Sequence, residues 1–187
     1  LEAIVGRAQE LHGNLLGAAV VAAGDSMVGG APPCDHDPAR LSAMDPQDLI
    51  DRLGLSPHPE GGWYRETWRD DPADGGRGVG SAIYFLLGAG ERSHWHRVDA
   101  AEVWHHYAGD PLELAIAEGE HHIVVLLGDD LAAGEEPQAL VPARAWQAAR
   151  STGAWTLVGA TVSPAFEFSG FELAAPGWTP EGWTIPG

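Results

Sequence analysis

Short apolar runs separated by turn-forming residues dominate this chain from Trp63 onward. Residues 81–87 form a continuous apolar run of strand length, and residues 112–117 alternate apolar with polar or small side chains. Gly, Pro and Asp interrupt these runs at a spacing that is typical of an antiparallel sandwich or barrel. We therefore predict an all-β fold with strands near 63–68, 81–87, 94–97, 103–107, 112–117, 123–127, 138–141, 155–162 and 166–173.

One short helix is expected before the strands. Between Ser42 and Gly54, three apolar residues share one helical face, and Pro46 suits the first turn. Either Ser42 or Asp45 can cap the helix, and Gly54 can end it. The many alanines of residues 143–149 favour a helix by composition alone, but we interpret this segment as strand or turn.

The front of the chain differs from this patterned body. Residues 1–44 are rich in Ala and Gly, so we interpret them as an extension that packs on a partner subunit, and residues 45–187 as one domain. The apolar run 15–23 is too short to span a membrane and lacks the basic start of a signal peptide. We expect a helix or a flexible arm there.

Composition limits the partners. The chain has 27 acidic and 10 basic residues, for a formal net charge of -17. Such a surface repels nucleic acid and anionic membranes, so we expect a small-molecule substrate instead. The single cysteine excludes an intrachain disulfide and a multi-cysteine zinc site, which favours a cytoplasmic protein.

The densest chemistry lies between Gly88 and Gly109. Residues two apart in a regular strand share a face, so His94 and His96 are expected to project together. For the same reason Glu102, Trp104 and His106 form a second set on one face. Three imidazoles and a carboxylate that converge in a barrel can bind a divalent metal or transfer protons.

A second group of polar side chains enters the first strand. The fork of Arg65 suits a carboxylate or phosphate, and Glu66 can accept hydrogen bonds from sugar hydroxyls. Strand alternation lets only one of these two face inward. Further candidates are Arg97 as an alternative anion ligand, Trp104 as a pocket-lining or core residue, and Tyr64 or Tyr107 as proton carriers.

These residues resemble a known superfamily. The spacing of Gly88, His94-x-His96, Glu102 and Gly109 is similar to the first cupin motif, with one or two extra residues before the glutamate. Residues 45–176 resemble one cupin family of unknown function, through the phrases at 58–67, 82–87, 93–98, 102–111, 141–143 and 161–168. The resemblance implies a double-stranded β-helix (cupin jelly roll), usually a homodimer, and a relation to sugar-nucleotide epimerases.

The second cupin motif is incomplete. Arg144 stands where the motif has glycine, and Gln147 stands where it has the last metal-binding histidine. A metal set would then comprise His94, His96 and Glu102, completed by Gln147 or by His106. Such a set suits Zn, Mn, Fe or Ni, and without it the site is metal-free. No organic cofactor is indicated.

The resemblance implies a small-molecule enzyme but no particular reaction. We expect an isomerase or epimerase that acts on a polar, sugar-like or carboxylated substrate. His96 would be the general base or a metal ligand, with Glu102 as its charge partner and Tyr64 as a proton carrier. The alternatives are a metal-dependent oxygenase or lyase that uses the same ligands, and a cupin that binds a small ligand without turnover.

Overall fold

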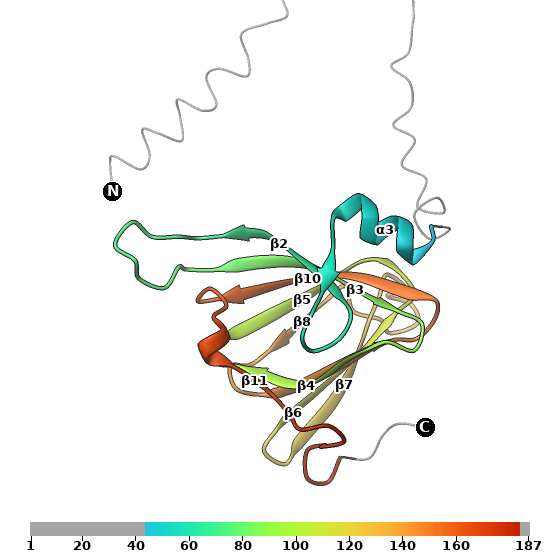
Figure 1. Cartoon of the computed structure of the whole chain (residues 1–187). Coiled ribbons are helices and arrows are strands. Elements are labelled where there is room, and N and C mark those ends of the chain that lie inside the picture. The colour runs from blue at the N-terminus through green and yellow to red at the C-terminus, as the bar shows by residue number, and fades with distance from the viewer. Residues whose placement is uncertain (1–43, 184–187) are drawn as a thin grey trace, which may run out of the picture. The chain divides into compact units, whose positions relative to one another are not determined.

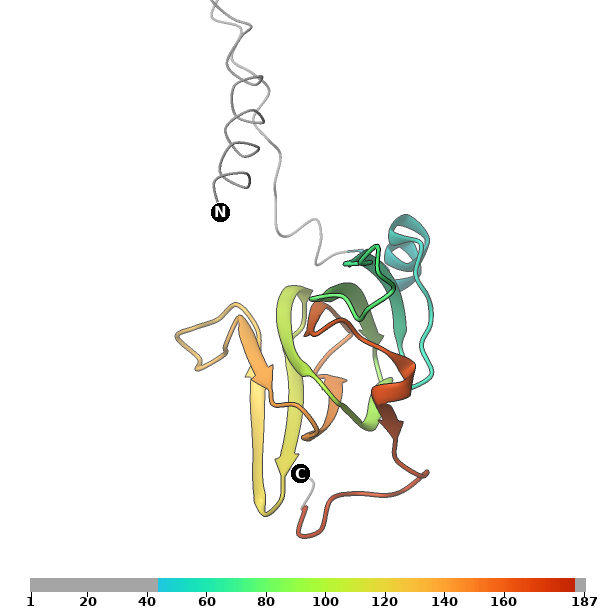
Figure 2. The ribbon, with the colours of Figure 1, turned by 90° about the vertical axis from the view of Figure 1, so that its left-hand side faces the viewer.

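Two antiparallel β-sheets face each other in the computed structural model, which describes residues 44–183 (Figure 1, Figure 2). Sheet A has the order β1 (Ser56–Pro57), β2 (Trp63–Arg69), β3 (Ser81–Gly88), β10 (Trp155–Ser163), β5 (Ala101–Gly109) and β8 (Gln138–Val141). Sheet B has the order β11 (Phe171–Leu173), β4 (Arg92–Val98), β9 (Trp146–Ser151), β6 (Leu112–Glu118) and β7 (His121–Leu127). The chain crosses repeatedly between the sheets, which confirms the expected all-β jelly roll.

The core fills the space between the sheets. Because successive strand residues point to opposite faces, every second residue along a strand turns its side chain toward the space between the sheets. Sheet A contributes Phe85, Trp104 and Val158, and sheet B contributes Leu112 and Leu114, all of them nearly or fully buried. Burying one such side chain contributes about 1.5–3 kcal/mol, so this layer holds the two sheets together.

The predicted helix is confirmed as α3 (Pro46–Leu53). The side chain of Asp45 accepts a hydrogen bond from the backbone N–H of Gln47 at 2.8 Å, so Asp45 is the cap of the two that were considered. Leu49 and Ile50 are buried with Leu86 of β3 and with residues of β10, on the face of sheet A that is turned away from the core.

Two predictions for the second half of the chain are now decided. Residues 146–151 form β9 and pair with both β4 and β6, so a strand is right despite the alanines of that segment. The strand predicted at 166–173 is wrong in its first half. A 3-10 turn spans Phe168–Gly170 and only Phe171–Leu173 form a strand. The predictions for residues 1–43 lie outside the described residues.

No helix within residues 44–183 has the length and apolarity that crossing a membrane requires.

A β-bulge interrupts the alternation of β4. Ser93 pairs with Ala149 and His96 pairs with Gln147, so His94 and Trp95 together stand opposite a single residue of β9. As a result Ser93 and His96 are both buried, although they are three residues apart, while His94 is exposed. The expectation that His94 and His96 share a face is therefore wrong, because it assumed a regular strand.

The loop between β1 and β2 lies directly on this bulge. The backbone N–H of His94 donates a hydrogen bond to the carbonyl oxygen of Glu60 at 2.8 Å. Gly61 has a φ of 108°, and a Cβ added there would lie 2.1 Å from the carbonyl oxygen of Arg92. Only glycine permits this approach, which brings the Glu60 side chain to the sheet.

We expect Gly61→Ala to destabilise the fold by about 3 kcal/mol, because the new methyl group both strains the backbone and displaces β4. Gly90→Ala is the matched control, since Gly90 also has a positive φ (76°) but nothing within 4 Å of its added Cβ. The control should lose only about 1 kcal/mol. Urea unfolding of both variants measures the difference, and equal losses would contradict the proposed packing of the loop.

Candidate functional site

A cavity of about 280 Å³, the inner cavity, opens between the two sheets. Its polar groups come from the loop before β2 and from strands of both sheets. They are His58, Glu60, Tyr64, Glu66, Arg69, Ser81, His96 and Glu102. The rest of its wall is apolar and largely aromatic. An enclosed space with a few converging polar groups is the usual form of a small-molecule site.

His96 and Glu60 form the buried centre of this cavity. His96 Nε2 lies 3.3 Å from Oε2 of Glu60, and both side chains are almost inaccessible to solvent. The hydroxyl of Ser93 donates to Glu60 Oε1 at 2.9 Å. The other ring nitrogen of His96, Nδ1, lies 2.8 Å from the carbonyl oxygen of His94. Each ring nitrogen of His96 therefore contacts a polar group of the protein.

This geometry decides which nitrogen of His96 carries hydrogen. A carbonyl oxygen only accepts, so Nδ1 carries the hydrogen and donates it to His94. Nε2 is then left as the acceptor that faces Glu60. Burial lowers the pKa of His96, although the charge of Glu102 and the hydrogen bond to His94 oppose that shift. Burial also raises the pKa of Glu60 to about 8, against the opposing effect of the Ser93 hydrogen bond.

Glu60 is therefore mostly protonated at neutral pH and His96 mostly neutral. The carboxyl O–H of Glu60 can then donate to His96 Nε2. In this protonation state the two groups hold one proton between them and carry no net charge, which avoids the cost of burying separated charges.

Glu102 is held on the other side of the same cavity by a chain of hydrogen bonds. The indole N–H of Trp104 donates to Oε1 of Gln147 at 2.9 Å, which fixes the orientation of the carboxamide. The amide nitrogen of Gln147 then donates to Oε2 of Glu102. Burial raises the pKa of Glu102 to about 7, despite the opposing effects of His96 and Gln147. Its carboxyl group can thus take up or release a proton near neutral pH.

His58 completes the buried polar cluster. Its Nδ1 lies 3.5 Å from Glu60 Oε2, and its ring packs edge-on against Tyr64 with centroids 4.5 Å apart. Burial, and to a lesser extent the charge of His96, lowers the pKa of His58 to about 4. His58 is therefore neutral at physiological pH and acts as a polar wall rather than a cation.

Among the described residues, Arg69 is the one arginine that lines the inner cavity, and its guanidinium is already paired. The guanidinium of Arg69 makes three hydrogen bonds to the carboxylate of Glu66 and a fourth, at 2.7 Å, to the carbonyl oxygen of Phe166. Next to it, Phe166, Phe168 and Phe171 form an aromatic wall. The cavity thus has a paired arginine and aromatic rings at its rim and buried carboxyl groups inside, with no unpaired cation among the lining residues.

Five of the predicted site residues do line the inner cavity: His96, Glu102, Tyr64, Glu66 and Trp104. Their functional roles stay predictions. Trp104 is also part of the core, so both interpretations of that residue hold.

Arg65 does not face the cavity. Because Tyr64 and Glu66 are turned inward, alternation turns Arg65 to the opposite face of sheet A, where its guanidinium lies 5.4 Å from the ring centre of Tyr84. The prediction that only one member of the Arg65–Glu66 pair points inward was right, and the inward residue is Glu66.

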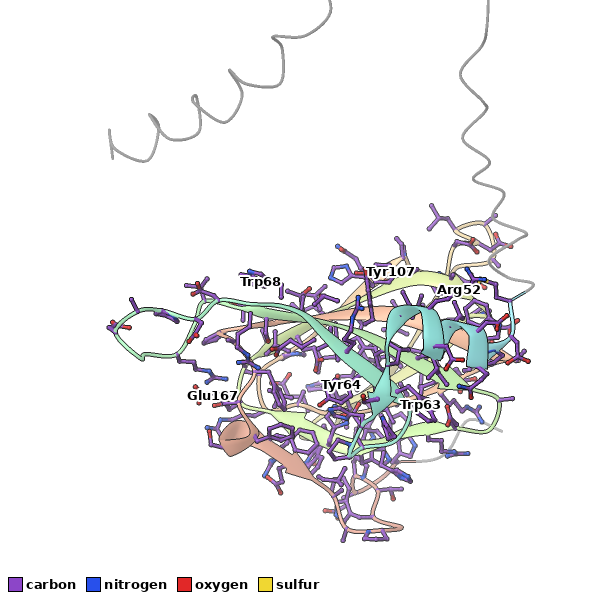
Figure 3. All side chains as sticks on the ribbon, turned by 45° about the horizontal axis from the view of Figure 1, so that its top comes forward. Arg52, Trp63, Tyr64, Trp68, Tyr107 and Glu167 are labelled. Carbon is purple, nitrogen blue, oxygen red and sulfur yellow. The ribbon has the colours of Figure 1, made fainter. Side chains whose placement is uncertain are left out.

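Arg97 and Tyr107 also lie outside the cavity. Arg97 follows the buried His96, so it is turned to the outside of sheet B, where it pairs with Glu172 at 2.6 Å. Tyr107 is 51% exposed on the outside of sheet A, because a second bulge in β5 makes it an extra residue opposite β10. Figure 3 shows Tyr107 on the outer side of sheet A and Tyr64 turned toward the space between the sheets. Neither Arg97 nor Tyr107 can contact a ligand in the inner cavity.

The predicted metal set of three histidines and a glutamate does not assemble. The bulge turns His94 outward, Gln147 is occupied by Trp104 and Glu102, and His106 is absent from the cavity wall. Within residues 44–183, no group of three or more His, Cys, Asp or Glu side chains is placed to hold a metal ion. The donors present therefore do not fit the metal that the resemblance implied.

Five polar residues of the site were not predicted from the sequence: His58, Glu60, Arg69, Ser81 and Ser93. A signal was present for two of them, because His58-Pro-Glu60-Gly-Gly belongs to a phrase that resembles the family, and its two glycines indicate a closely packed loop. The chemistry was expected only in the strand that follows this loop. Ser93 carried no signal of its own, since only the bulge turns it inward.

Glu60→Gln should change how stability depends on pH. The folded-state pKa of Glu60 is raised from 4.5 to about 8, so its protonated form stabilises the fold at low pH, and this contribution is lost as pH rises through that window. We expect the free energy of unfolding of Glu60→Gln, relative to that of wild type, to increase by on the order of 3 kcal/mol when the pH is raised from 5 to 8.5. Denaturant unfolding at both pH values measures the gain. The exposed Glu120→Gln is the control, and a pH-independent difference for Glu60→Gln would contradict the assignment.

Gln147→His tests whether the metal set can be completed. Because His94 stays on the outer face of β4, we expect this variant to gain no stoichiometric transition metal relative to wild type. Elemental analysis of both proteins after equilibration with zinc, manganese, iron and nickel measures the metal content. A gain of one metal ion per chain would show that the bulge can rearrange to bring His94 inward.

Comparison with known proteins places the chain in a family. The family described as "Cupin superfamily (DUF985)" matches residues 47–174. A solved protein from Shewanella oneidensis is 42% identical, with a TM-score of 0.67 over 71% of this chain and 85% of that one. A hypothetical protein from Leishmania major is 32% identical, with a TM-score of 0.65 over 71% of this chain and 88% of that one. No curated protein matches. The chain therefore belongs to the DUF985 family of the cupin superfamily.

Proposed function

We propose that this cupin is an isomerase or epimerase that moves a proton within a small, neutral, polar carbonyl compound. The observation that carries the proposal is the contact of His96 Nε2 with the Glu60 carboxyl at 3.3 Å, in the same buried cavity as Glu102. Acid–base catalysis is most efficient when the pKa of the catalytic group lies near the working pH. The pKa values of Glu60 and Glu102, about 8 and about 7, meet that condition.

The two carboxyl groups suit two different tasks. Glu102 is partly ionised at neutral pH and would take the proton from the carbon next to the substrate carbonyl. The C–H electron pair becomes the double bond of an enol, while the Glu60–His96 pair gives its shared proton to the carbonyl oxygen. Glu102 then gives its proton to the former carbonyl carbon, while the hydroxyl group on the other carbon of the enediol gives its proton to the Glu60–His96 pair and becomes the new carbonyl. The isomerisation is then complete and both groups are restored.

This proposal changes the role expected for His96. The sequence suggested His96 as the general base, with Glu102 as its partner. Since Nε2 faces Glu60 and Nδ1 faces the carbonyl of His94, we assign the base to Glu102 and proton donation to the Glu60–His96 pair. Tyr64 remains a wall residue next to His58 in this scheme.

The charge of the cavity favours a neutral substrate. Arg65 and Arg97, expected to bind an anion, lie outside, and Arg69 is paired with Glu66. Bringing a carboxylate or phosphate beside the buried, partly ionised Glu102 would cost Coulomb energy that no unpaired cation among the described lining residues offsets. Sugar-like hydroxycarbonyl compounds therefore fit better than the carboxylated substrates also considered.

Proton exchange in D2O tests the proposal whatever the product of the reaction is. We expect the protein to exchange the α-hydrogen of at least one member of a panel of neutral three- to six-carbon hydroxyaldehydes and hydroxyketones, followed by proton NMR. His96→Asn and Glu102→Gln should each slow exchange by about 100-fold or more, because each removes one of the two proton-transfer groups.

His121→Asn serves as the control, since His121 is exposed at the start of β7 and should leave the exchange rate unchanged. If a panel member binds to the inner cavity without any exchange of its α-hydrogen, the protein is a binding cupin rather than an isomerase. An equal loss of rate in all three variants would contradict the assigned roles.

The expected homodimer and the cytoplasmic location stay predictions. The outer face of sheet A exposes Trp68 and Tyr107, both about half accessible, beside the region that α3 covers (Figure 3). Exposed aromatic side chains of this kind are enriched at subunit interfaces, which supports the dimer.

A further inference from the structure

A second cavity, the outer cavity, lies on the side of sheet B that faces away from the core. Its volume is about 370 Å³, and it is bounded by β4, β6, β7, β9 and the segment that follows β11. Figure 1 shows this last segment running along the side of sheet B that is turned away from sheet A. The outer cavity shares no carboxyl group with the inner one and plays no part in the proposed isomerisation.

The bulge in β4 builds one wall of the outer cavity. His94 and Trp95 stand together opposite Ala148, so both contribute to the outer wall where a regular strand would offer one side chain. Ala115 and Ala148 form part of the lining on the sheet, and their methyl groups leave depth above it. His94, singled out from the sequence as a metal ligand, thus belongs to this second cavity.

Indole rings enclose the space. The ring of Trp183 lies 4.9 Å from that of Trp95 at an interplanar angle of 78°, and the ring of Trp178 lies 6.5 Å from it at 84°. The segment that carries both is tied to β4, because the N–H of Ala174 donates to the carbonyl oxygen of Trp95 at 2.9 Å. These edge-to-face contacts hold the rings at steep angles to one another, so the wall of the cavity is largely aromatic surface, which suits a planar aromatic group.

Two guanidinium groups border the same space. Arg150 is paired with Glu113, which also lines the cavity. Arg92 is exposed, and within residues 44–183 no carboxylate forms an ion pair with it. The chain has only 10 basic against 27 acidic residues. An unpaired positive charge beside an indole-lined cavity therefore has the opposite sign to the net charge of the chain. The planar fork of arginine matches a carboxylate with two parallel hydrogen bonds.

We propose that the outer cavity binds a small planar aromatic carboxylate. The ring stacks among the three indoles, over the alanines of the sheet, and the carboxylate meets Arg92. A cationic ligand is disfavoured by Arg92 and Arg150, and an aliphatic anion leaves the indole faces uncovered. The proposal does not depend on the reaction proposed for the inner cavity.

Calorimetric titration of the full chain with 4-nitrobenzoate tests the site, and 4-nitrobenzamide is the neutral probe of the same shape. We expect saturable binding of one 4-nitrobenzoate per chain and at least tenfold weaker binding of 4-nitrobenzamide. Arg92→Gln and Trp183→Leu should each weaken 4-nitrobenzoate binding by tenfold or more. Circular dichroism and thermal melting of Arg92→Gln, an exposed substitution, establish that the fold is intact.

Two control variants locate the bound probe. Arg144 lies beside the neighbouring hollow around Trp146 and does not line the outer cavity, so Arg144→Gln should bind 4-nitrobenzoate as wild type does. Glu102→Gln should also leave binding unchanged, because Glu102 lies in the inner cavity. The proposal is overturned if 4-nitrobenzoate does not bind saturably, if both probes bind equally, or if Glu102→Gln or Arg144→Gln alters binding as much as Arg92→Gln.

Discussion

The extra residue in β4 is the constraint on which both cavities depend. By placing two residues opposite Ala148, it turns Ser93 and His96 toward the core and His94 and Trp95 away from it. The backbone of His94 then holds the interior groups, since its N–H donates to the carbonyl of Glu60 and its carbonyl accepts from His96 Nδ1. A residue whose side chain lies outside thereby fixes both members of the buried pair.

The protonation states of the buried acids and imidazoles follow from their removal from water in a cavity that offers no unpaired cation among its described lining residues. Four titratable groups, those of Glu60, Glu102, His58 and His96, are removed from water. Arg69, the one arginine that residues 44–183 contribute to the cavity wall, is paired at the rim. Desolvation disfavours every charged form, so it raises the pKa of the carboxyl groups and lowers the pKa of the imidazoles. The pKa values of the two glutamates are therefore about 8 and about 7, close to neutral pH, which is why proton transfer is the reaction class we favour.

Local rules predicted much of the fold. The capping of α3 by Asp45 and its end at Gly54 follow from preferences of a few neighbouring residues, and the alternating runs located most strands within a few positions. The period of two also turned Glu102 and Trp104 inward correctly. It failed at β4, because a bulge depends on pairing with β9 and leaves no signature in the spacing of the histidines.

Sequence patterns alone were enough to predict the all-β architecture, the family resemblance and two members of the buried site, His96 and Glu102. Those features rest on periodicity and on motif residues that are adjacent in the chain. The pairing of Glu60 with His96 and the outward direction of His94 became visible only in the folded chain. The structure also showed that Arg65 and Arg97 lie outside the inner cavity. Strand register, the bulge and the close approach of the glycine loop depend on contacts between residues that lie far apart in the sequence. The pattern of one segment therefore cannot predict them.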